Sequence, residues 1–433
     1  MKIFILSIFV LTYVLIIAFS NKKALVTGAV AIVGVTACLI SGHLSFAGLF
    51  GSLKYDVILL LFGIMMTVGI FTESGMPNAL AEKMVSKIPN ALVALVLLSV
   101  LSGVISAFVD NVATVLMLAP IGLAVAKKID VSPIPVIISI AVSSNLQGAA
   151  TLVGDTTSIM LADPMYANMS FIDFFFMDGK FSIFWAVELG MVVTIPILIF
   201  IFRKQNKKLL YVADKVNVTS IVPTILLLAN FVCLVVSSFL PFGIVIGGME
   251  ITNGVICMAF GIASLIFHVV KSKQNVFKTL KKSVDFETIL FLISLFAIIA
   301  CVDAVGIIDD IGNFFLGIGD KNVFLLYTLI VFGSVLISAF IDNIPYVATM
   351  LPVISTVSMA MPEYSTVLYF GLLIGATLGG NITPFGASAN VVGIGVLKKE
   401  GYKVKMSDFF KIGIPFTLAA VLSGYGFCWL VWA

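Results

Sequence analysis

Two carboxylates lie in the middle of long apolar stretches, and an amide follows each of them. Asp110 and Asn111 lie in SAFVDNVATVLMLAP, and Asp342 and Asn343 lie in SAFIDNIPYVATMLP. An ionised carboxylate is costly in hydrocarbon unless it is paired, protonated or bound to a cation. The two motifs therefore predict a cation or proton site, with capping of a half-helix as the simpler alternative.

A second polar stretch follows each of these motifs. SSNLQGAATLVGD contains Thr151 and ends at Asp155, and GATLGGNITPFGASAN contains Thr383. Both stretches interrupt apolar segments with Gly, Asn and Thr, and Pro384 removes a backbone donor in the second. We expect two broken helices here, whose free backbone amides and carbonyls can bind ions.

One offset of 232 residues relates the two sets of motifs without a gap. Among the identical residues that it connects are Asp110 and Asp342, Gly148 and Gly380, Thr151 and Thr383, and Gly154 and Gly386. The same offset carries Asp155 to Ala387, so the two predicted half-sites are not equivalent. The pattern predicts an internal duplication.

The composition decides the class of protein. The 433 residues are 61% hydrophobic and 11% charged, and their mean hydropathy is +1.18. Apolar runs of about 18 residues or more recur along the chain, which predicts an all-α polytopic protein in a lipid bilayer. The net charge of +3 predicts no nucleic-acid partner. No nucleophile–base pair or metal-ligand spacing is visible, so we expect neither an enzyme nor a cofactor.

The elements that carry the motifs are two paired apolar segments, 91–127 and 322–357, and two interrupted ones, 134–162 and 366–397. The remaining candidate spans are 2–19, 24–41, 55–72, 181–202, 219–240, 250–270, 286–302 and 409–432. The loop pattern fits each paired segment either as a re-entrant hairpin or as two full spans.

We expect the chain to consist of two repeats, 1–210 and 211–433. The placement of the lysines predicts which side of the membrane each loop faces. Each repeat has an odd number of spans, so the second copy should be inverted, as in many secondary transporters. Nearly all Lys and Arg residues then share one side, in the loops 20–23, 73–90, 127–133, 203–218, 271–285 and 398–411. The other side keeps Lys2, Lys54, Lys180 and Lys321. The positive-inside rule places the first side in the cytoplasm and both termini outside the cytoplasmic (inner) membrane.

Positive charge is scarce inside the predicted spans. Arg203 is the only arginine, and no lysine lies deep in a predicted span. A multiply charged anion would meet the site carboxylates without a countercharge. This charge balance favours a cation, a proton or a neutral solute.

The chain resembles the ion-transporter superfamily, in the branch of arsenite permeases, D-type sodium/proton antiporters and the P protein. It is also citrate-transporter-like and more distantly similar to divalent-anion/sodium symporters. The stretches that carry this resemblance are SAFVDNVATVLMLAPI, SSNLQGAATLVGD, AFIDNIPYVATMLPV and GATLGGNITPFGASANVVGIGVLKKEGYKVKMSDFF. The resemblance implies a homodimer in which two re-entrant hairpins move by an elevator-like mechanism.

The resemblance also implies where the site lies. The hairpin tips would be Asp110–Thr114 and Asp342–Tyr346, and the unwound segments Asn145–Asp155 and Gly379–Asn390. Anion symporters of the superfamily have Ser-Asn-Thr at these tips, so the Asp-Asn pairs disfavour citrate or another dicarboxylate. The expected substrate or ion ligands are Asp110, Asn111, Thr114, Asn145, Thr151, Asp155, Asp342, Asn343, Asn381, Thr383 and Asn390.

We expect a secondary transporter that couples a small inorganic solute or ion to H⁺ or Na⁺. The leading hypotheses are arsenite or antimonite efflux and sodium/proton exchange. Sodium would bind at Asp110 with Asn111 and at Asp342 with Asn343. The alternatives are sodium-coupled uptake of a carboxylate such as citrate, and an anion channel.

Overall fold

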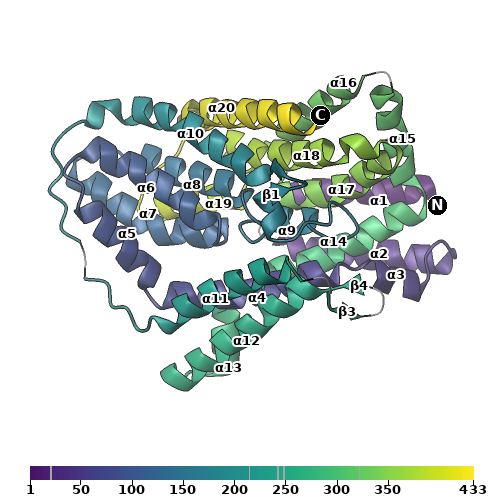
Figure 1. Ribbon diagram of the computed structural model, residues 1–433, viewed down its shortest axis with the longest axis horizontal. Helices are drawn as coiled ribbons and strands as arrows, with labels where there is room; N and C mark the ends of the chain where they lie inside the picture. Colours follow the sequence, from purple (N-terminus) through teal and green to yellow (C-terminus); the bar gives the residue numbers. More distant parts are fainter. Residues whose placement is uncertain (20–21, 214, 241–242, 247–248, 321) are drawn as a thin grey trace.

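The computed structural model describes residues 1–433 except 20–21, 214, 241–242, 247–248 and 321. Part of the predicted loop 20–23 and the predicted outer Lys321 therefore lie outside the described residues. Helices dominate the described part, and the strands β1 (Phe176–Met177) with β2 (Lys180–Phe181) and β3 (Val245–Ile246) with β4 (Met249–Glu250) form two small hairpins (Figure 1). The prediction of an all-α polytopic protein is confirmed.

Among the described residues, ten α-helices come from the first part of the chain and ten from the second. The first ten are α1 (Lys2–Ala18), α2 (Lys23–Ile40), α3 (Phe46–Ser52), α4 (Tyr55–Glu73), α5 (Met76–Ser86), α6 (Ala91–Ser106), α7 (Asn111–Lys128), α8 (Ile134–Gly148), α9 (Thr156–Leu161) and α10 (Ile183–Phe202). The others are α11 (Val222–Ser237), α12 (Thr252–Ser272), α13 (Val276–Ser283), α14 (Phe286–Ala304), α15 (Ile307–Gly319), α16 (Val323–Ser338), α17 (Asn343–Ala360), α18 (Ser365–Gly379), α19 (Ser388–Lys399) and α20 (Met406–Trp432).

The helix boundaries repeat at the offset found in the sequence. Helices α6 and α7 begin and end at residues equivalent to the ends of α16 and α17, and α9 begins at the residue equivalent to the start of α19. The packing follows the same relation, because α4 packs on α12 while α14 packs on α2. The short helices α5 and α15 were not predicted. They also correspond to each other, since α5 follows α4 and α15 follows α14.

Nine helices within the described residues are long and apolar enough to cross a membrane. The arms α6 and α16 have 16 residues each, so they reach about 24 Å, less than the roughly 30 Å of a bilayer's hydrocarbon core. The predicted interruptions lie after α8 and after α18, where a short 3₁₀ turn, Gly380–Ile382, follows. These lengths fit hairpin arms better than full spans, although their depth in a bilayer stays a prediction.

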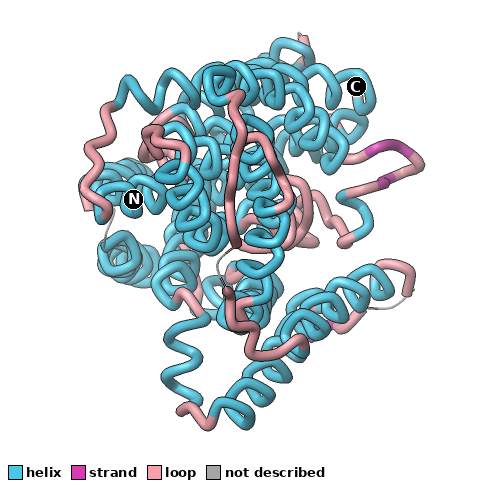
Figure 2. The backbone as a smooth tube through the Cα atoms, turned by 90° about the vertical axis from the view of Figure 1, so that its left-hand side faces the viewer, coloured by secondary structure: helices cyan, strands magenta, loops and turns pink. Residues whose placement is uncertain are grey.

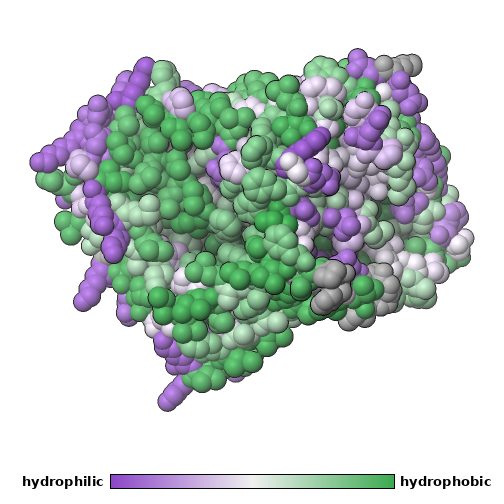
Figure 3. Space-filling view, in the orientation of Figure 1, coloured by the Kyte–Doolittle hydropathy of each residue, from purple (hydrophilic) through white to green (hydrophobic). Residues whose placement is uncertain are grey.

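The two helix pairs lie toward opposite ends of the molecule. Helices α6, α7 and α8 gather on the left of Figure 1, and α15, α17 and α18 on the right. Viewed from the left-hand side, many helices are nearly end-on, and the loop after α10 runs across that face (Figure 2). A broad apolar surface separates two more hydrophilic ends (Figure 3).

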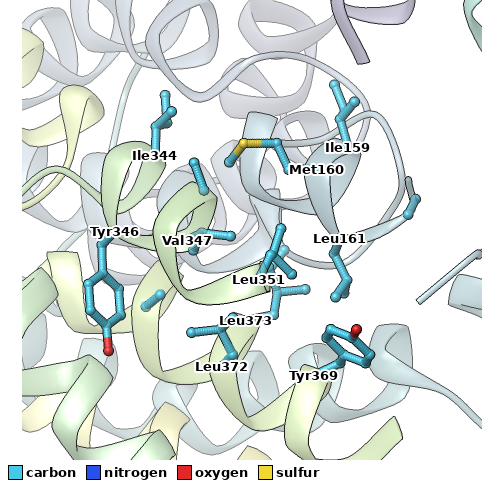
Figure 4. Close-up of a cluster of buried hydrophobic side chains, with 14 of the residues drawn as sticks. Ile159, Met160, Leu161, Ile344, Tyr346, Val347, Leu351, Tyr369, Leu372 and Leu373 are labelled. Atoms are coloured by element: carbon cyan, nitrogen blue, oxygen red, sulfur yellow. The ribbon is translucent and has the colours of Figure 1, made fainter. Parts of the chain in front are cut away.

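A buried apolar cluster ties the first broken helix to the second half of the chain. The close-up in Figure 4 shows Ile159 and Leu161 of α9 beside Val347 and Leu351 of α17 and Leu373 of α18. All five side chains are buried. Segments that are distant in sequence are therefore held together around the two breaks.

Candidate functional site

Each break packs tightly against the tip of its own helix pair. A Cβ added to Gly154 would lie 2.6 Å from the Gly148 carbonyl oxygen and 3.0 Å from that of Ala107. A Cβ added to the equivalent Gly386 would lie 2.7 Å from the Gly380 carbonyl oxygen. Real Cβ atoms do not approach this closely, so both positions require glycine.

The two threonines of the breaks secure the same junction. Thr151 donates its hydroxyl to the carbonyl of Ala107, and Thr383 donates to the carbonyl of Ala339 at the equivalent position. The Thr383 oxygen also accepts from the amide of Gly386 at 3.1 Å. Both predicted site threonines therefore join a break to a tip, which leaves their hydroxyl protons unavailable to a solute.

Asp110 and Asp342 both cap the second helix of their pair. The Asp110 Oδ1 accepts from the amides of Val112 at 2.9 Å and Ala113 at 3.1 Å, and the Asp342 Oδ1 accepts from that of Ile344 at 3.4 Å. The simpler reading of the motifs, helix capping, is thus present in both. In both aspartates the helix cap uses Oδ1, so Oδ2 is the oxygen that remains to bind an ion or another side chain.

The first half-site brings two carboxylates to one small cavity. Asp110 and Asp155 line a space of about 30 Å³ against apolar side chains of α4, including Leu61 and Ile64. The Asp155 Oδ2 accepts from the Asn343 amide at 2.9 Å and from the Thr157 hydroxyl at 3.1 Å. A tip residue of the second half therefore completes the first half-site.

The second half-site holds a carboxylate and an ammonium. Lys23 at the start of α2 donates to the Asp342 Oδ2 at 2.9 Å, and each side chain is only 16% exposed. Ser388 donates to the same oxygen at 3.4 Å. Lys23 was predicted to lie in a loop, and the site carboxylates were expected to have no countercharge, which is wrong for the second tip. A lysine is long enough to extend from a helix end to a neighbouring element.

A chain of buried amides connects the halves. The Asn111 Oδ1 accepts from Ser106 at 2.6 Å, and its Nδ2 donates to the Asn145 Oδ1 at 3.3 Å. Asn145 in turn donates to the carbonyl of Thr377 at 2.7 Å and to the Asn381 Oδ1 at 3.1 Å. Asn145 and Thr377 are related by the 232-residue offset, so equivalent positions of the two halves meet.

Two further predicted ligands, Thr114 and Asn390, make contacts of another kind. Thr114 is fully buried and makes a long contact of 3.5 Å to the carbonyl of Val109. Asn390 donates to the carbonyls of Gly380 at 3.0 Å and Thr383 at 3.1 Å, so it supports the second break. Neither residue lines the small cavity.

Sequence reasoning missed several residues of the site, among them Lys23, Thr157 and Thr377. Lys23 neutralises Asp342, and the hydroxyls of Thr157 and Thr377 lie 3.0 Å apart where the two breaks meet. The offset could have indicated Thr377, because it is the counterpart of Asn145. No local signal marks Lys23.

A cation at this site would depend on few acidic ligands. Within the described residues, no group of three or more His, Cys, Asp or Glu is placed to hold a metal ion. Asp110 and Asp155 with neighbouring hydroxyl and backbone oxygens suit a proton or a monovalent hard cation. Asn343 points its Nδ2 donor at Asp155, so its Oδ1 is the group that could contact sodium, whereas the Asn111 Oδ1 already accepts from Ser106.

A family model described as "Citrate transporter" matches residues 13–375. The 46 kDa membrane protein of Mycobacterium leprae is 28% identical over 449 residues, which cover 99% of each chain. An uncharacterized transporter of Synechocystis is 27% identical over 404 residues, covering 88% of this chain and 87% of its own. The mouse P protein is 24% identical over 452 residues, covering 88% of this chain and 54% of its own.

Two solved structures share the fold. The YdaH transporter of Alcanivorax borkumensis has a TM-score of 0.62 at 14% identity and covers 89% of this chain and 87% of its own. MtrF of Neisseria gonorrhoeae, from a class described as antimetabolite efflux pumps, has a TM-score of 0.58 at 15% identity, covering 92% and 84%. The predicted superfamily resemblance is confirmed: this chain belongs to the citrate transporter family and is a multi-pass membrane transporter, not an enzyme.

Proposed function

We propose that the chain is a secondary active transporter whose coupling ion, H⁺ or Na⁺, binds between Asp110 and Asp155. The observation that carries this proposal is the cavity of about 30 Å³ that these two carboxylates line. Two ionised carboxylates beside one small apolar-walled space repel each other, so a proton or a cation between them is stabilising.

The size of the cavity separates the coupling ion from the transported solute. A space of about 30 Å³ suits a single ion or water molecule and is too small for citrate. The solute would therefore occupy a space that opens when the tips move. The leading solutes are arsenite or antimonite in efflux, or sodium itself in exchange for protons.

The architecture of the proposal has two inverted repeats, 1–210 and 211–433. The arms α6 with α7 and α16 with α17 would be re-entrant hairpins that move together, elevator-like, against the remaining helices. Equal helix boundaries and the short 16-residue arms support this view. Both termini would face the outside of the cytoplasmic membrane, and the working unit would be a homodimer.

Sodium-coupled uptake of a carboxylate such as citrate is a second candidate. The family's description favours it, and Lys23 weakens the argument from charge because it places an ammonium beside one tip. In this alternative a substrate carboxylate would replace Asp342 as the partner of Lys23.

Transport into liposomes that contain a pH dye tests both candidates. Sodium, arsenite and citrate are added separately to the purified protein, with and without an imposed proton gradient. Proton flux driven by sodium or arsenite, and absent in Asp155→Asn, supports the exchange function. Sodium-dependent citrate accumulation without proton flux selects uptake, and a flux that continues without any coupled gradient indicates a channel.

A further inference from the structure

We infer that the chain has a binding site for an anionic phospholipid, separate from the ion site. A cavity of about 910 Å³ lies where the end of α10, the start of α8 and the start of α20 meet. None of its lining residues belongs to the tips or the breaks.

The wall of this cavity is apolar. Ile197 and Phe200 of α10, Ile134 and Pro135 of α8, and Pro415 of α20 contribute side chains without polar atoms. Phe200 is 62% exposed, and nearby Ile199 and Leu418 also face outward. The apolar wall is therefore open to the outside of the molecule. Such a wall suits acyl chains.

The rim of the cavity is cationic. Arg203 and Lys204 follow α10, and Lys411 projects from the first turns of α20. Among the described residues, none of these three cations has an ion-pair partner. The single lining carboxylate, Asp408, accepts from the Lys405 amide at 3.2 Å as part of its helix cap. The rim therefore keeps an excess of positive charge.

Arg203 sits at the boundary between wall and rim. Its guanidinium lies 4.0 Å from the centre of the Phe200 ring, so a cation–π contact holds it above the apolar wall. Arginine binds phosphate oxygens in a bidentate manner. A headgroup phosphate on Arg203 would thus place its acyl chains along the wall.

The combination of a cationic rim and an apolar wall selects the occupant. Free phosphate would use the rim alone, whereas a second copy of the chain packed on the wall would cover three cations without supplying charge. Basic pockets between transmembrane helices on the cytoplasmic side bind anionic headgroups. The lysine distribution predicts that this end of the chain is cytoplasmic.

The test compares two triple variants of the full chain. Arg203→Gln/Lys204→Gln/Lys411→Gln removes the rim, and Lys398→Gln/Lys399→Gln/Lys403→Gln removes the same charge from exposed residues elsewhere on the same predicted side. Delipidated protein in detergent is titrated with phosphatidylglycerol, phosphatidylcholine or glycerol phosphate, and bound lipid is counted by native mass spectrometry.

We expect wild type and the control variant to prefer phosphatidylglycerol over phosphatidylcholine, and the rim variant to bind phosphatidylglycerol roughly 100-fold more weakly. Ile197→Ser, which changes the wall without removing the ring that contacts Arg203, should weaken lipid binding without changing the response to glycerol phosphate. Equal phosphatidylglycerol binding by the two triple variants would overturn the site. If glycerol phosphate binds as tightly as the lipid, the site is one for free phosphate and not for a phospholipid. If the rim variant has a different oligomeric state from wild type, this face is an interface with a second copy of the chain.

Discussion

The two tips have the same sequence motif and the same helix cap, yet their carboxylates have opposite surroundings. Asp110 shares a small cavity with a second carboxylate, Asp155, whereas Asp342 forms an ion pair with Lys23. At the 232-residue offset, Asp155 corresponds to Ala387 and Lys23 to Val255. Two charged residues that are not repeated therefore make one half-site anionic and the other neutral.

This difference indicates that the two halves, whose motifs repeat at one offset, have different binding properties. The repeated residues, such as the glycines and threonines of the breaks, hold the backbone in both halves. The unrepeated charges decide what each half can bind. Under the proposed function, the coupling ion binds in the first half, and the second tip carries its own built-in cation.

The largest effect is expected for Asp155→Asn. The substitution keeps the size of the side chain and removes the carboxylate that exists in only one half, so coupled flux should fall to background. The pH-dye assay in liposomes measures the flux, and gel filtration checks the fold. Asp178→Asn, in an exposed turn at positive φ that asparagine tolerates, is the matched control. Wild-type flux from Asp155→Asn would remove the first half-site from the mechanism.

The second expected effect separates the two tip aspartates. Asp342→Asn leaves the Lys23 ammonium partly buried without its partner, which should cost about 3 kcal/mol of stability. Asp110→Asn keeps a good helix cap and should cost well under about 1 kcal/mol. Unfolding in detergent measures both.

The double variant Lys23→Gln/Asp342→Asn isolates this ion pair. It should recover most of the stability that Asp342→Asn loses, because no buried charge remains unpaired. Additive losses in the double variant would mean that the two side chains do not interact. Equal losses from Asp110→Asn and Asp342→Asn would contradict the proposed asymmetry.

Alanine at the break glycines should affect the two halves alike. Gly154→Ala and Gly386→Ala each place a Cβ within 3 Å of backbone oxygens, so each should cost about 1–3 kcal/mol. Gly395→Ala is the control, since nothing lies within 4 Å of its added Cβ. A loss of stability in only one of the two variants would show that the backbone packing at the two breaks differs.

The smallest effect is expected for Thr151→Val, which loses one hydrogen bond to a tip carbonyl, worth about 1 kcal/mol, and keeps the shape of the side chain. Thr383→Val should cost more, because the Thr383 oxygen also accepts from the amides of Phe385 and Gly386. Flux should persist in both variants. Loss of flux with unchanged unfolding would assign these hydroxyls to the solute instead.

Apolar runs and a fixed offset were enough to predict much of the fold. The breaks after α8 and α18 and the tips at Asp110 and Asp342 follow from glycine, asparagine and aspartate inside apolar sequence. Asp155 was predicted because it is a carboxylate that directly follows the first break. Lys23 was not, because the pair joins residues 319 positions apart and depends on how α2 packs beside the tip. The short helices α5 and α15 were missed because neither is long enough to register as a span.

The bond from Asn343 to Asp155 has a consequence for how the protein is made. The two residues are 188 positions apart, so the carboxylate is synthesised long before its amide donor. At about 5–20 residues per second, a nascent chain would carry Asp155 without this partner for roughly 10–40 s. Until Asn343 is made, the Thr157 hydroxyl can still donate to the Asp155 carboxylate, but the first half-site is completed only after the second tip has been synthesised.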